Sequence, residues 1–392
     1  MDLESKKKIT FLCYSPVDLT GYYDILSKHA DCWWIVWNPY VRDELIAKGY
    51  NKIIFKKIPW GGWKDGIIFK ALSWFSEIPR VKEFLFNNLV NSIKSDLIIS
   101  DTVLTLKGCK VSASKILVFH SVCYKKYIMS LDNLELFDFL FLPSDYHRLE
   151  IMKRFGKKWE DKLKVVGWPR ADKLLELNSA NDISIESKLS SINLDPTKKT
   201  LMYAPTWNSF DNGKMFPELF GEDVDAFEQL AIRCNELNLN LIIRLHPFMA
   251  KLIESKELQV IAEKHSVLWG IDQHRGYIED GGQELLLLTD YLISDVSGII
   301  SEFMMLDKPI IFIEPDADGF RWSESDLTEN LRPGMVTKTL DELLLAIETS
   351  IKYPEEYSLA RKEIVNKIFY KLDGSATSRA CDTILTLSEE RF

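Results

Sequence analysis

The sequence lacks the cysteine spacing that is typical of zinc and dithiol sites. None of its six cysteines forms a C-x-x-C pair. Cys13, Cys109 and Cys234 lie within or beside apolar or helical stretches. This pattern indicates reduced cysteines in the core of a cytoplasmic protein rather than a disulfide framework.

Long apolar runs and an excess of positive charge are also missing. No stretch of about 18 or more apolar residues occurs, so we expect no membrane-spanning helix. The first residues, MDLESKKKIT, carry lysines but lead into an ordinary strand pattern rather than a secretory apolar core. The formal net charge of −9 argues against a general nucleic-acid binder. We therefore expect a cytoplasmic protein without a nucleic-acid partner.

The 392 residues suffice for two domains, and 46% hydrophobic with 27% charged residues is an ordinary globular mixture. Short apolar runs alternate with helical patterns in both halves, which predicts parallel sheets with helices on both faces. The expected strands cover 8–14, 32–37, 52–55, 96–100, 115–120, 137–142, 163–166, 200–203, 239–245, 267–269 and 308–313, and a further strand begins at 291.

The helical patterns complete this alternation. The expected helices cover 22–29, 41–48, 81–93, 145–155, 224–237, 252–264, 282–288, 340–351 and 354–369, and residues 15–21 have the pattern of a loop. Residues 178–197 are rich in Ser, Asn and Asp, so we place the domain boundary near residue 178.

The stretch 291–303 predicts a buried strand, a polar turn and a helix. Ser294, Asp295, Ser297 and Gly298 lie in the turn. A helix N-terminus offers free backbone N–H groups, and small residues there let a phosphate approach the backbone. We interpret the turn as a site for a phosphate or diphosphate, and the alternative is an ordinary serine-capped helix.

Two other predicted strands end in polar residues. Thr206 follows one strand, and the next strand ends in the run that contains Arg244 and His246. Arginine is a forked donor suited to phosphate oxygens, and a protonated histidine can offset charge on a leaving group. Arg244 and His246 could also end a strand in a simple salt bridge. Because the carboxyl ends of parallel strands meet at one edge, we favour a common site.

His120 ends the buried strand predicted at 115–120. Its ordinary pKa, near 6.5, suits a proton acceptor at neutral pH. The alternative is a histidine that is hydrogen-bonded within the core.

Aromatic residues crowd segment 58–78, with lysines among them. This pattern fits contact with a membrane surface, where aromatic rings lie at headgroup depth. An aromatic cover packed on the sheet is the more common explanation of such a segment. An apolar groove for an acceptor is a third interpretation.

Several motifs, taken in order, resemble those of the CDP-glycerol glycerophosphotransferase family. They are Ala204-Pro205-Thr206-Trp207, Arg244-Leu245-His246-Pro247, Ser294-Asp295-Val296-Ser297-Gly298-Ile299, Leu306-Asp307-Lys308-Pro309-Ile310-Ile311-Phe312 and Asp373-Gly374-Ser375-Ala376-Thr377-Ser378-Arg379. Gly167-Trp168-Pro169-Arg170-Ala171-Asp172 resembles the family's Gly-x-Pro-Arg-Asn-Asp element. The resemblance covers about residues 115–380, and residues 1–110 carry no matching motif.

The resemblance implies an α/β protein of the GT-B fold, in which two Rossmann-like domains with parallel sheets face a central cleft. Residues 1–177 would form an acceptor-binding domain and residues 178–374 a domain that binds the CDP-activated donor. Residues 375–392 would form a helix that returns to the first domain. Such enzymes build teichoic-acid-like or capsular polymers, which implies a lipid-linked or oligosaccharide acceptor and a place at the inner face of the cell membrane. Segment 58–78 is the candidate for peripheral contact with that membrane.

The resemblance also implies roles for individual residues. His120 matches the histidine of the family's His-Gly-x-x-x-Lys element, its general base, and Lys125 matches the lysine. His246 matches a second histidine that contacts the donor diphosphate, and Ser297 matches one of the family's serines at the phosphate site. Ser121 stands where the family has glycine, and Gly298 where a second serine is usual. The remaining expected contacts are Thr206, Arg244 and Ser294 to the donor, and Arg170 to the acceptor or a phosphate.

The mechanism that follows is direct, in-line attack. An acceptor hydroxyl loses its proton to His120 and attacks the β-phosphorus of a CDP-alditol, and CMP leaves. Asp316 and Asp318 lie in a predicted loop, so we expect no metal held by the protein, although Mg²⁺ bound to the donor diphosphate is compatible with this site.

Two other classes of function remain open from the sequence. An inverting GT-B glycosyltransferase, or a related nucleotide-sugar epimerase, would use the same fold and phosphate turn. A catalytically silent binding protein is less favoured, because histidines occur at two predicted strand ends. Turnover of CDP-glycerol or CDP-ribitol against UDP- and CMP-sugars would discriminate between the enzyme classes.

Overall fold

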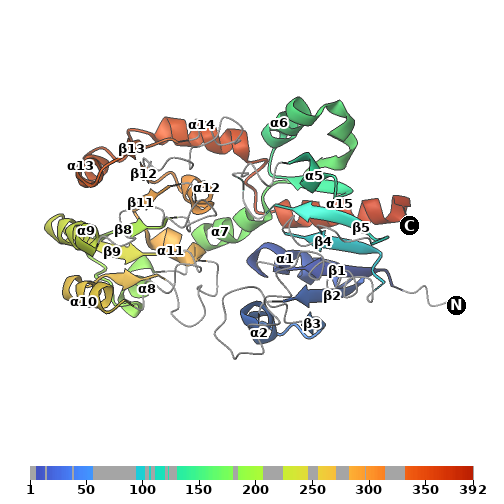
Figure 1. Cartoon of the computed structure of the whole chain (residues 1–392), viewed down its shortest axis with the longest axis horizontal. Coiled ribbons are helices and arrows are strands. Elements are labelled where there is room, and N and C mark those ends of the chain that lie inside the picture. Colours follow the sequence, from blue (N-terminus) through green and yellow to red (C-terminus); the bar gives the residue numbers. More distant parts are fainter. Residues whose placement is uncertain are drawn as a thin grey trace, which may run out of the picture. The chain divides into compact units, whose positions relative to one another are not determined.

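The structure is a computed structural model. It describes residues 6–13, 16–37, 39–55, 94–101, 106, 111–119, 122, 130–179, 184–205, 224–245, 255–270, 282–295, 297–313 and 332–391, to which all structural statements below refer. The chain divides into two compact units, whose elements are labelled in Figure 1. Unit 1 comprises Met1–Ser121, Lys125–Asp172 and Tyr370–Phe392, and unit 2 comprises Val122–Tyr124 and Lys173–Phe369.

The described strands of unit 1 form one sheet of order β3-β2-β1-β4-β5-β6-β7. All neighbouring strands in it are parallel. The strands are β1 (Lys8–Leu12), β2 (Asp31–Val36), β3 (Ile53–Phe55), β4 (Leu97–Ser100), β5 (Ser114–Val118), β6 (Phe139–Leu142) and β7 (Leu163–Val165). Each expected strand of the first half is therefore present, with its ends shifted by a few residues.

Helices pack on this sheet. They are α1 (Pro16–Leu26), α2 (Pro39–Ala47), α5 (Leu131–Leu134), α6 (Asp145–Phe155), the 3₁₀ helix η2 (Lys157–Lys162) and α15 (Ala376–Arg391), while α7 (Pro169–Ser179) begins in unit 1 and continues into unit 2. The loop expected at 15–21 is wrong, because α1 begins at Pro16. Proline suits the first turn of a helix, where its missing N–H has no partner to lose.

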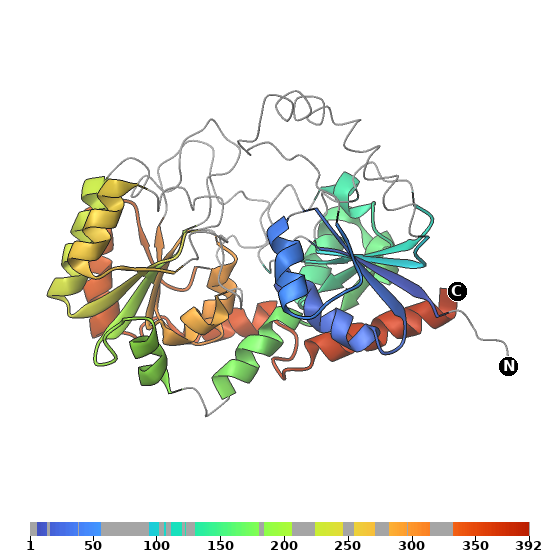
Figure 2. The same ribbon diagram turned by 90° about the horizontal axis from the view of Figure 1, so that it is seen from below.

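The core of unit 1 is rich in aromatic residues and includes the C-terminal helix. The rings of Tyr23 and Trp34 stack with centroids 4.9 Å apart. Ala380, Cys381 and Ile384 of α15 are buried in the same cluster. Helix α15 lies beside α1 (Figure 2), so a helix more than 300 residues away in sequence completes the core of the first unit.

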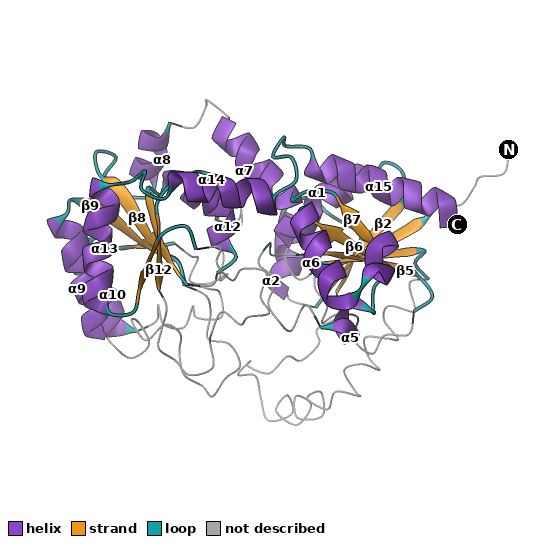
Figure 3. Ribbon diagram, turned by 90° about the horizontal axis from the view of Figure 1, so that it is seen from above, coloured by secondary structure: helices purple, strands orange, loops and turns teal. Residues whose placement is uncertain are grey.

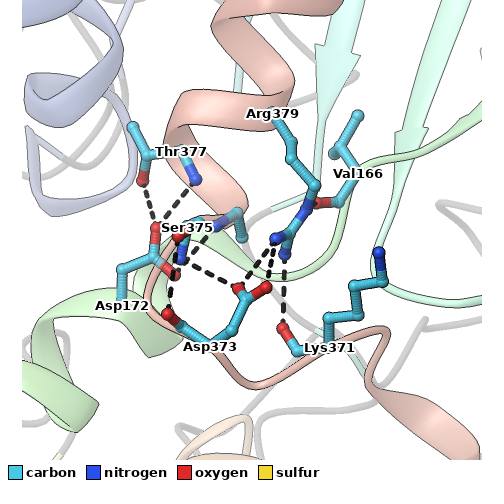
Figure 4. Close-up of polar contacts among 8 residues, drawn as sticks. Val166, Asp172, Lys371, Asp373, Ser375, Thr377 and Arg379 are labelled. Carbon is cyan, nitrogen blue, oxygen red and sulfur yellow. Dashed lines mark hydrogen bonds and ion pairs between the residues drawn. The ribbon is translucent and has the colours of Figure 1, made fainter.

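The carboxylate of Asp172 caps the N-terminus of α15 (Figure 4). It accepts hydrogen bonds from the backbone N–H groups of Ala376 (3.1 Å) and Thr377 (2.7 Å), and from the Thr377 hydroxyl (2.8 Å). A carboxylate at this position satisfies N–H groups that have no partner within the helix and interacts favourably with the helix dipole. The Asp172 cap therefore ties α15 to the start of α7.

Arg379 reinforces the same junction. Its guanidinium group holds both carboxylate oxygens of Asp373, at 2.7 and 2.8 Å, and donates to the carbonyl oxygens of Val166 and Lys371 (Figure 4). Gly167 makes room for it: φ there is +94°, and a Cβ would lie 2.9 Å from Nη2 of Arg379. Only glycine satisfies both conditions at this position.

We predict that Asp172→Ala lowers the free energy of unfolding by about 1–2 kcal/mol, the usual cost of losing a helix N-cap. Thr377→Ala removes only the hydroxyl contact to the same carboxylate and should cost less. Urea unfolding of both variants measures the difference. An Asp172→Ala variant as stable as the wild type would contradict the assigned cap.

The described strands of unit 2 form a second parallel sheet, of order β10-β9-β8-β11-β12-β13. They are β8 (Lys199–Tyr203), β9 (Leu239–Ile243), β10 (Leu268–Trp269), β11 (Tyr291–Ser294), β12 (Ile310–Ile313) and β13 (Met335–Thr337). Strand β13 was not predicted from the sequence, because only its last residue, Thr337, is buried and it has no continuous apolar run.

Helices cover both faces of this sheet. Figures 2 and 3 show α9 (Val224–Glu236), α10 (Lys256–His265) and α13 (Leu340–Lys352) on one face, where their apolar side chains join the buried core. The other helices of unit 2 are α8 (Ile185–Ser191), α11 (Gln283–Leu288), α12 (Ile299–Met304) and α14 (Ser358–Ile368). The expected parallel sheets with helices on both faces are thus confirmed.

Two helices occupy the segment around the expected domain boundary. Helix α7 extends to Ser179 and α8 begins at Ile185, where the Ser184 hydroxyl accepts a hydrogen bond from the Ser187 N–H at 3.2 Å. The serines that indicated a linker therefore include a helix cap. None of the helices in the described part of the chain combines the length and apolar character that crossing a bilayer would need.

Candidate functional site

Three residues at the carboxyl ends of adjacent strands form a row at one edge of the unit 2 sheet. In the register, Tyr203 pairs with Ile243 of β9 and with Ile293 of β11. The next residues are Ala204, Arg244 and Ser294. The Arg244 N–H donates to the Tyr203 carbonyl at 2.8 Å, and the Ala204 N–H donates to that of Ile293 at 2.9 Å. The expected convergence of these strand ends is therefore present for the part described.

Ser294 is fully buried, and its hydroxyl donates a 2.6 Å hydrogen bond to the Ala204 carbonyl. This contact joins the ends of β11 and β8. The described contact is thus structural, and a direct contact of Ser294 with a donor stays a prediction.

A buried tyrosine and a buried aspartate adjoin this row in the sequence, one before Ala204 and the other after Ser294. Tyr203 and Asp295 are both fully buried. Burial, together with the nearby charge of Asp295, raises the pKa of Tyr203 well above its ordinary value. The phenol therefore stays protonated, as a donor group rather than a base.

The polar turn leads into α12 as expected, but the helix is shorter and more buried than its pattern indicated. Gly298 precedes it with φ −59° and ψ −23°, a conformation open to any residue. The Ser297 carbonyl accepts from the Ile300 N–H at 3.2 Å. All six helical residues are buried, including Ser301 and Glu302, so the helix is enclosed on every side.

The motif at 306–312 forms a corner that fixes two helices. Asp307 has φ +52°, a left-handed conformation that aspartate tolerates better than most residues. Its carboxylate accepts from Arg361 Nε at 2.9 Å and from the Ser358 hydroxyl at 2.7 Å, both on α14. The ammonium group of Lys308 donates to the carbonyls of Leu287 (2.9 Å) and Thr289 (2.6 Å) at the end of α11.

Both charged groups of this corner have shifted pKa values. Burial opposes the charge of Asp307, but hydrogen bonds from Lys362, Ser358 and Arg361 outweigh it and lower the pKa of Asp307. Burial lowers the pKa of Lys308. The charged groups of this corner therefore have a structural role, since they position α11 and α14.

Several expected site residues lie outside the described part of the chain. They are Thr206, His246, His120 and Lys125, and segment 58–78 and the pair Asp316 and Asp318 lie outside it too. Arg170 is described, as the second residue of α7, and is half-buried. Among the described residues, no group of three or more His, Cys, Asp or Glu side chains is arranged to hold a metal ion.

Comparison with known proteins decides the class of this chain. Residues 115–386 match the family model described as CDP-glycerol:poly(glycerophosphate) glycerophosphotransferase. The chain belongs to this family. The predicted resemblance is therefore confirmed. The expected enzyme class is confirmed too: members of this class transfer alditol-phosphate units from CDP-activated donors in wall polymer synthesis.

Relatives within the glycerophosphotransferase family span different shares of the chain. A teichoic acid glycerol-phosphate transferase of Staphylococcus aureus is 24% identical over 379 residues, which cover 92% of this chain and 87% of that protein. The teichoic acid ribitol-phosphate polymerase TarL of the same species is 28% identical over 231 residues, which cover 57% of this chain and 37% of that protein.

Solved structures share the fold. The wall teichoic acid polymerase TagF, in a variant soaked with CDPG, superposes with a TM-score of 0.64 at 19% identity, covering 100% of this chain and 92% of that one. A Staphylococcus aureus MnaA–UDP structure gives a TM-score of 0.63 at 14% identity, covering 98% and 97%. The expected GT-B fold class is thus confirmed.

The Asp307 corner allows a stability prediction with a defined pH dependence. Asp307→Asn keeps a residue that tolerates positive φ but removes the charge facing the buried Arg361. We expect a loss of about 2 kcal/mol at pH 7, less than the 3–5 kcal/mol of a fully buried pair, because the Asp307 side chain is 27% exposed. Glu176→Gln, in an exposed pair with Lys173, should change stability by less than about 0.5 kcal/mol.

The sign of the pH effect follows from the lowered pKa of Asp307. Its charge stabilises the fold above the unfolded pKa of about 3.9, and this contribution is lost as the pH falls through the folded value. The difference between wild type and Asp307→Asn should therefore shrink in urea unfolding below about pH 4. A constant difference from pH 7 to pH 3 would contradict the assignment.

Proposed function

We propose that this protein transfers glycerol phosphate from CDP-glycerol to a hydroxyl of a lipid-linked or glycan acceptor, releasing CMP. The observation that carries the proposal is the position of Arg244, at the carboxyl edge of the unit 2 sheet, in a chain of the glycerophosphotransferase family. The similar TagF structure soaked with CDPG and the similar teichoic acid glycerol-phosphate transferase support CDP-glycerol as the donor.

On the donor side, Arg244 would hold the diphosphate. A guanidinium group offers parallel N–H donors that match phosphate oxygens, and charge-assisted hydrogen bonds of this kind are short and strong. Ser297 and Gly298 lie at the same edge, after β11, and would add hydroxyl and backbone contacts. Thr206 and His246 each follow the last residue of their strand, Tyr203 and Ile243, by three positions in the sequence, and we assign them to the same diphosphate.

On the acceptor side, His120 would act as general base. It accepts the proton of the acceptor hydroxyl while that oxygen forms a bond to the β-phosphorus of the donor. The bond from this phosphorus to the bridging oxygen breaks, and the electron pair leaves with CMP. His246 and Arg244 would offset the negative charge that grows on the departing phosphate. Lys125 and Arg170 would contact the acceptor or its phosphates.

The domain assignment follows from these roles. We assign acceptor binding to residues 1–177, donor binding to residues 178–374 and the returning helix to residues 375–392. Segment 58–78 would bring the enzyme to the inner face of the cell membrane, where a lipid-linked acceptor lies.

Mass spectrometry of products tests the donor class. The protein is incubated with a lipid-like acceptor and, separately, CDP-glycerol, CDP-ribitol, a UDP-sugar and a CMP-sugar. With CDP-glycerol, we expect CMP and an acceptor enlarged by one or more glycerol-phosphate units. The other donors should give no product or react more slowly. Transfer from a nucleotide sugar, with no turnover of CDP-alditols, would overturn the proposal.

The same assay separates the roles of the two histidines. His120→Ala should reduce transfer by at least about a hundredfold, the usual contribution of general base catalysis, with unchanged affinity for CDP-glycerol. His246→Ala should weaken that affinity as well. Calorimetry provides the affinities. Transfer near the wild-type rate in His120→Ala would remove the assigned base.

A further inference from the structure

The side chain of Arg244 lies against two glycines. Gly270 follows β10, and its N–H donates to the Ile243 carbonyl at 2.8 Å. A Cβ on Gly270 would lie 3.4 Å from the Cβ of Arg244 and 2.9 Å from Cγ2 of Ile242. A side chain at Gly270 would therefore clash with Ile242 and would only touch the stem of Arg244.

Gly282 lies at the other end of the arginine. It is the residue before α11, with φ +77° and ψ +17°. A Cβ there would lie 2.5 Å from Cζ and 2.7 Å from Nε of Arg244. Real Cβ atoms do not approach other heavy atoms so closely, so the guanidinium group occupies the space that any side chain at position 282 would need.

The backbone at Gly282 has little freedom to retreat, because α11 is fixed along its length. Gln283 is fully buried, and Glu284 pairs with Lys188 at 2.7 Å. At the other end, Lys308 holds the Leu287 carbonyl. A methyl group added at position 282 would therefore displace the flexible end of Arg244 rather than the helix.

We propose that Gly282 is a positioning residue for donor binding: its missing side chain leaves the space that the Arg244 guanidinium occupies and so holds that group in place for the donor diphosphate. This inference rests on the proposed function, since it assigns Gly282 a role through Arg244. A pre-positioned guanidinium loses less conformational freedom when the diphosphate binds, which raises affinity.

The test is a double-mutant cycle in the full-length protein, with affinity for CDP-glycerol measured by calorimetry. Arg244→Ala should weaken binding about tenfold or more, the value of a charge-assisted hydrogen bond. Gly282→Ala should weaken it about tenfold in the wild-type background and less than about twofold in the Arg244→Ala background.

Gly49→Ala is the matched control. Gly49 has φ +89°, and a Cβ there would meet no atom within 4 Å. Both substitutions strain a backbone of positive φ, but only the one at Gly282 meets Arg244. Thermal unfolding should show similar losses of stability for the two, while affinity changes only in Gly282→Ala.

The outcomes separate the inference from the proposed function. Unchanged affinity in Arg244→Ala would contradict the diphosphate role of this arginine, and so the proposed function. Weaker binding in Arg244→Ala, together with unchanged affinity in folded Gly282→Ala, would overturn the inference alone. An equal effect of Gly282→Ala in both backgrounds would overturn it too, because the glycine would then act without Arg244.

The Arg244→Ala background also covers the case in which Gly282→Ala does not fold. Arg244→Ala removes Nε and Cζ, the atoms that a methyl group at position 282 would meet. Gly282→Ala should therefore fold in that background and bind CDP-glycerol within about twofold of Arg244→Ala alone. A double variant that remains unfolded would place the conflict in the backbone rather than at Arg244 and overturn the inference.

Discussion

Every described strand of unit 2 runs parallel to its neighbours, and the rest of the unit depends on this constraint. Backbone hydrogen bonds pair Tyr203 with Ile243 and Ile293, which lie 40 and 90 residues further along the chain. The residue after each of these is thereby placed at one edge of the sheet. Arg244 reaches this edge because β9 ends there, and no contact between side chains is needed to bring it to the other strand ends.

The charged residues near this edge hold helices in position rather than take part in the reaction. Asp307 and Lys308 use their charges to fasten α14 and α11, and α11 in turn presents Gly282 to the guanidinium of Arg244. Removing one partner of a buried ion pair is costly, so the pair holds the two elements that it joins in one arrangement. The same use of charge recurs in unit 1, where Asp172 and Arg379 attach α15 to the first sheet.

The sequence predicted the parts of this arrangement that depend on periodicity. Both parallel sheets, the order of elements around 291–303 and the placement of Arg244 at a strand end follow from apolar runs and turn residues. Strand β13 was missed because only its last residue is buried, so it has no apolar run to indicate a strand. The roles of Asp307 and Lys308 were missed because their partners, on α14 and at the end of α11, are chosen by tertiary packing. Gly282 could have been noticed as the second of two adjacent glycines before a helix, but its proximity to Arg244 requires coordinates.

A crystal structure of the full-length protein with bound CDP-glycerol is the most direct test of this account. We predict that the donor diphosphate lies at the carboxyl edge of the unit 2 sheet, with Arg244 guanidinium nitrogens within about 3 Å of its oxygens. A diphosphate bound away from that edge, with Arg244 facing only protein atoms, would contradict it.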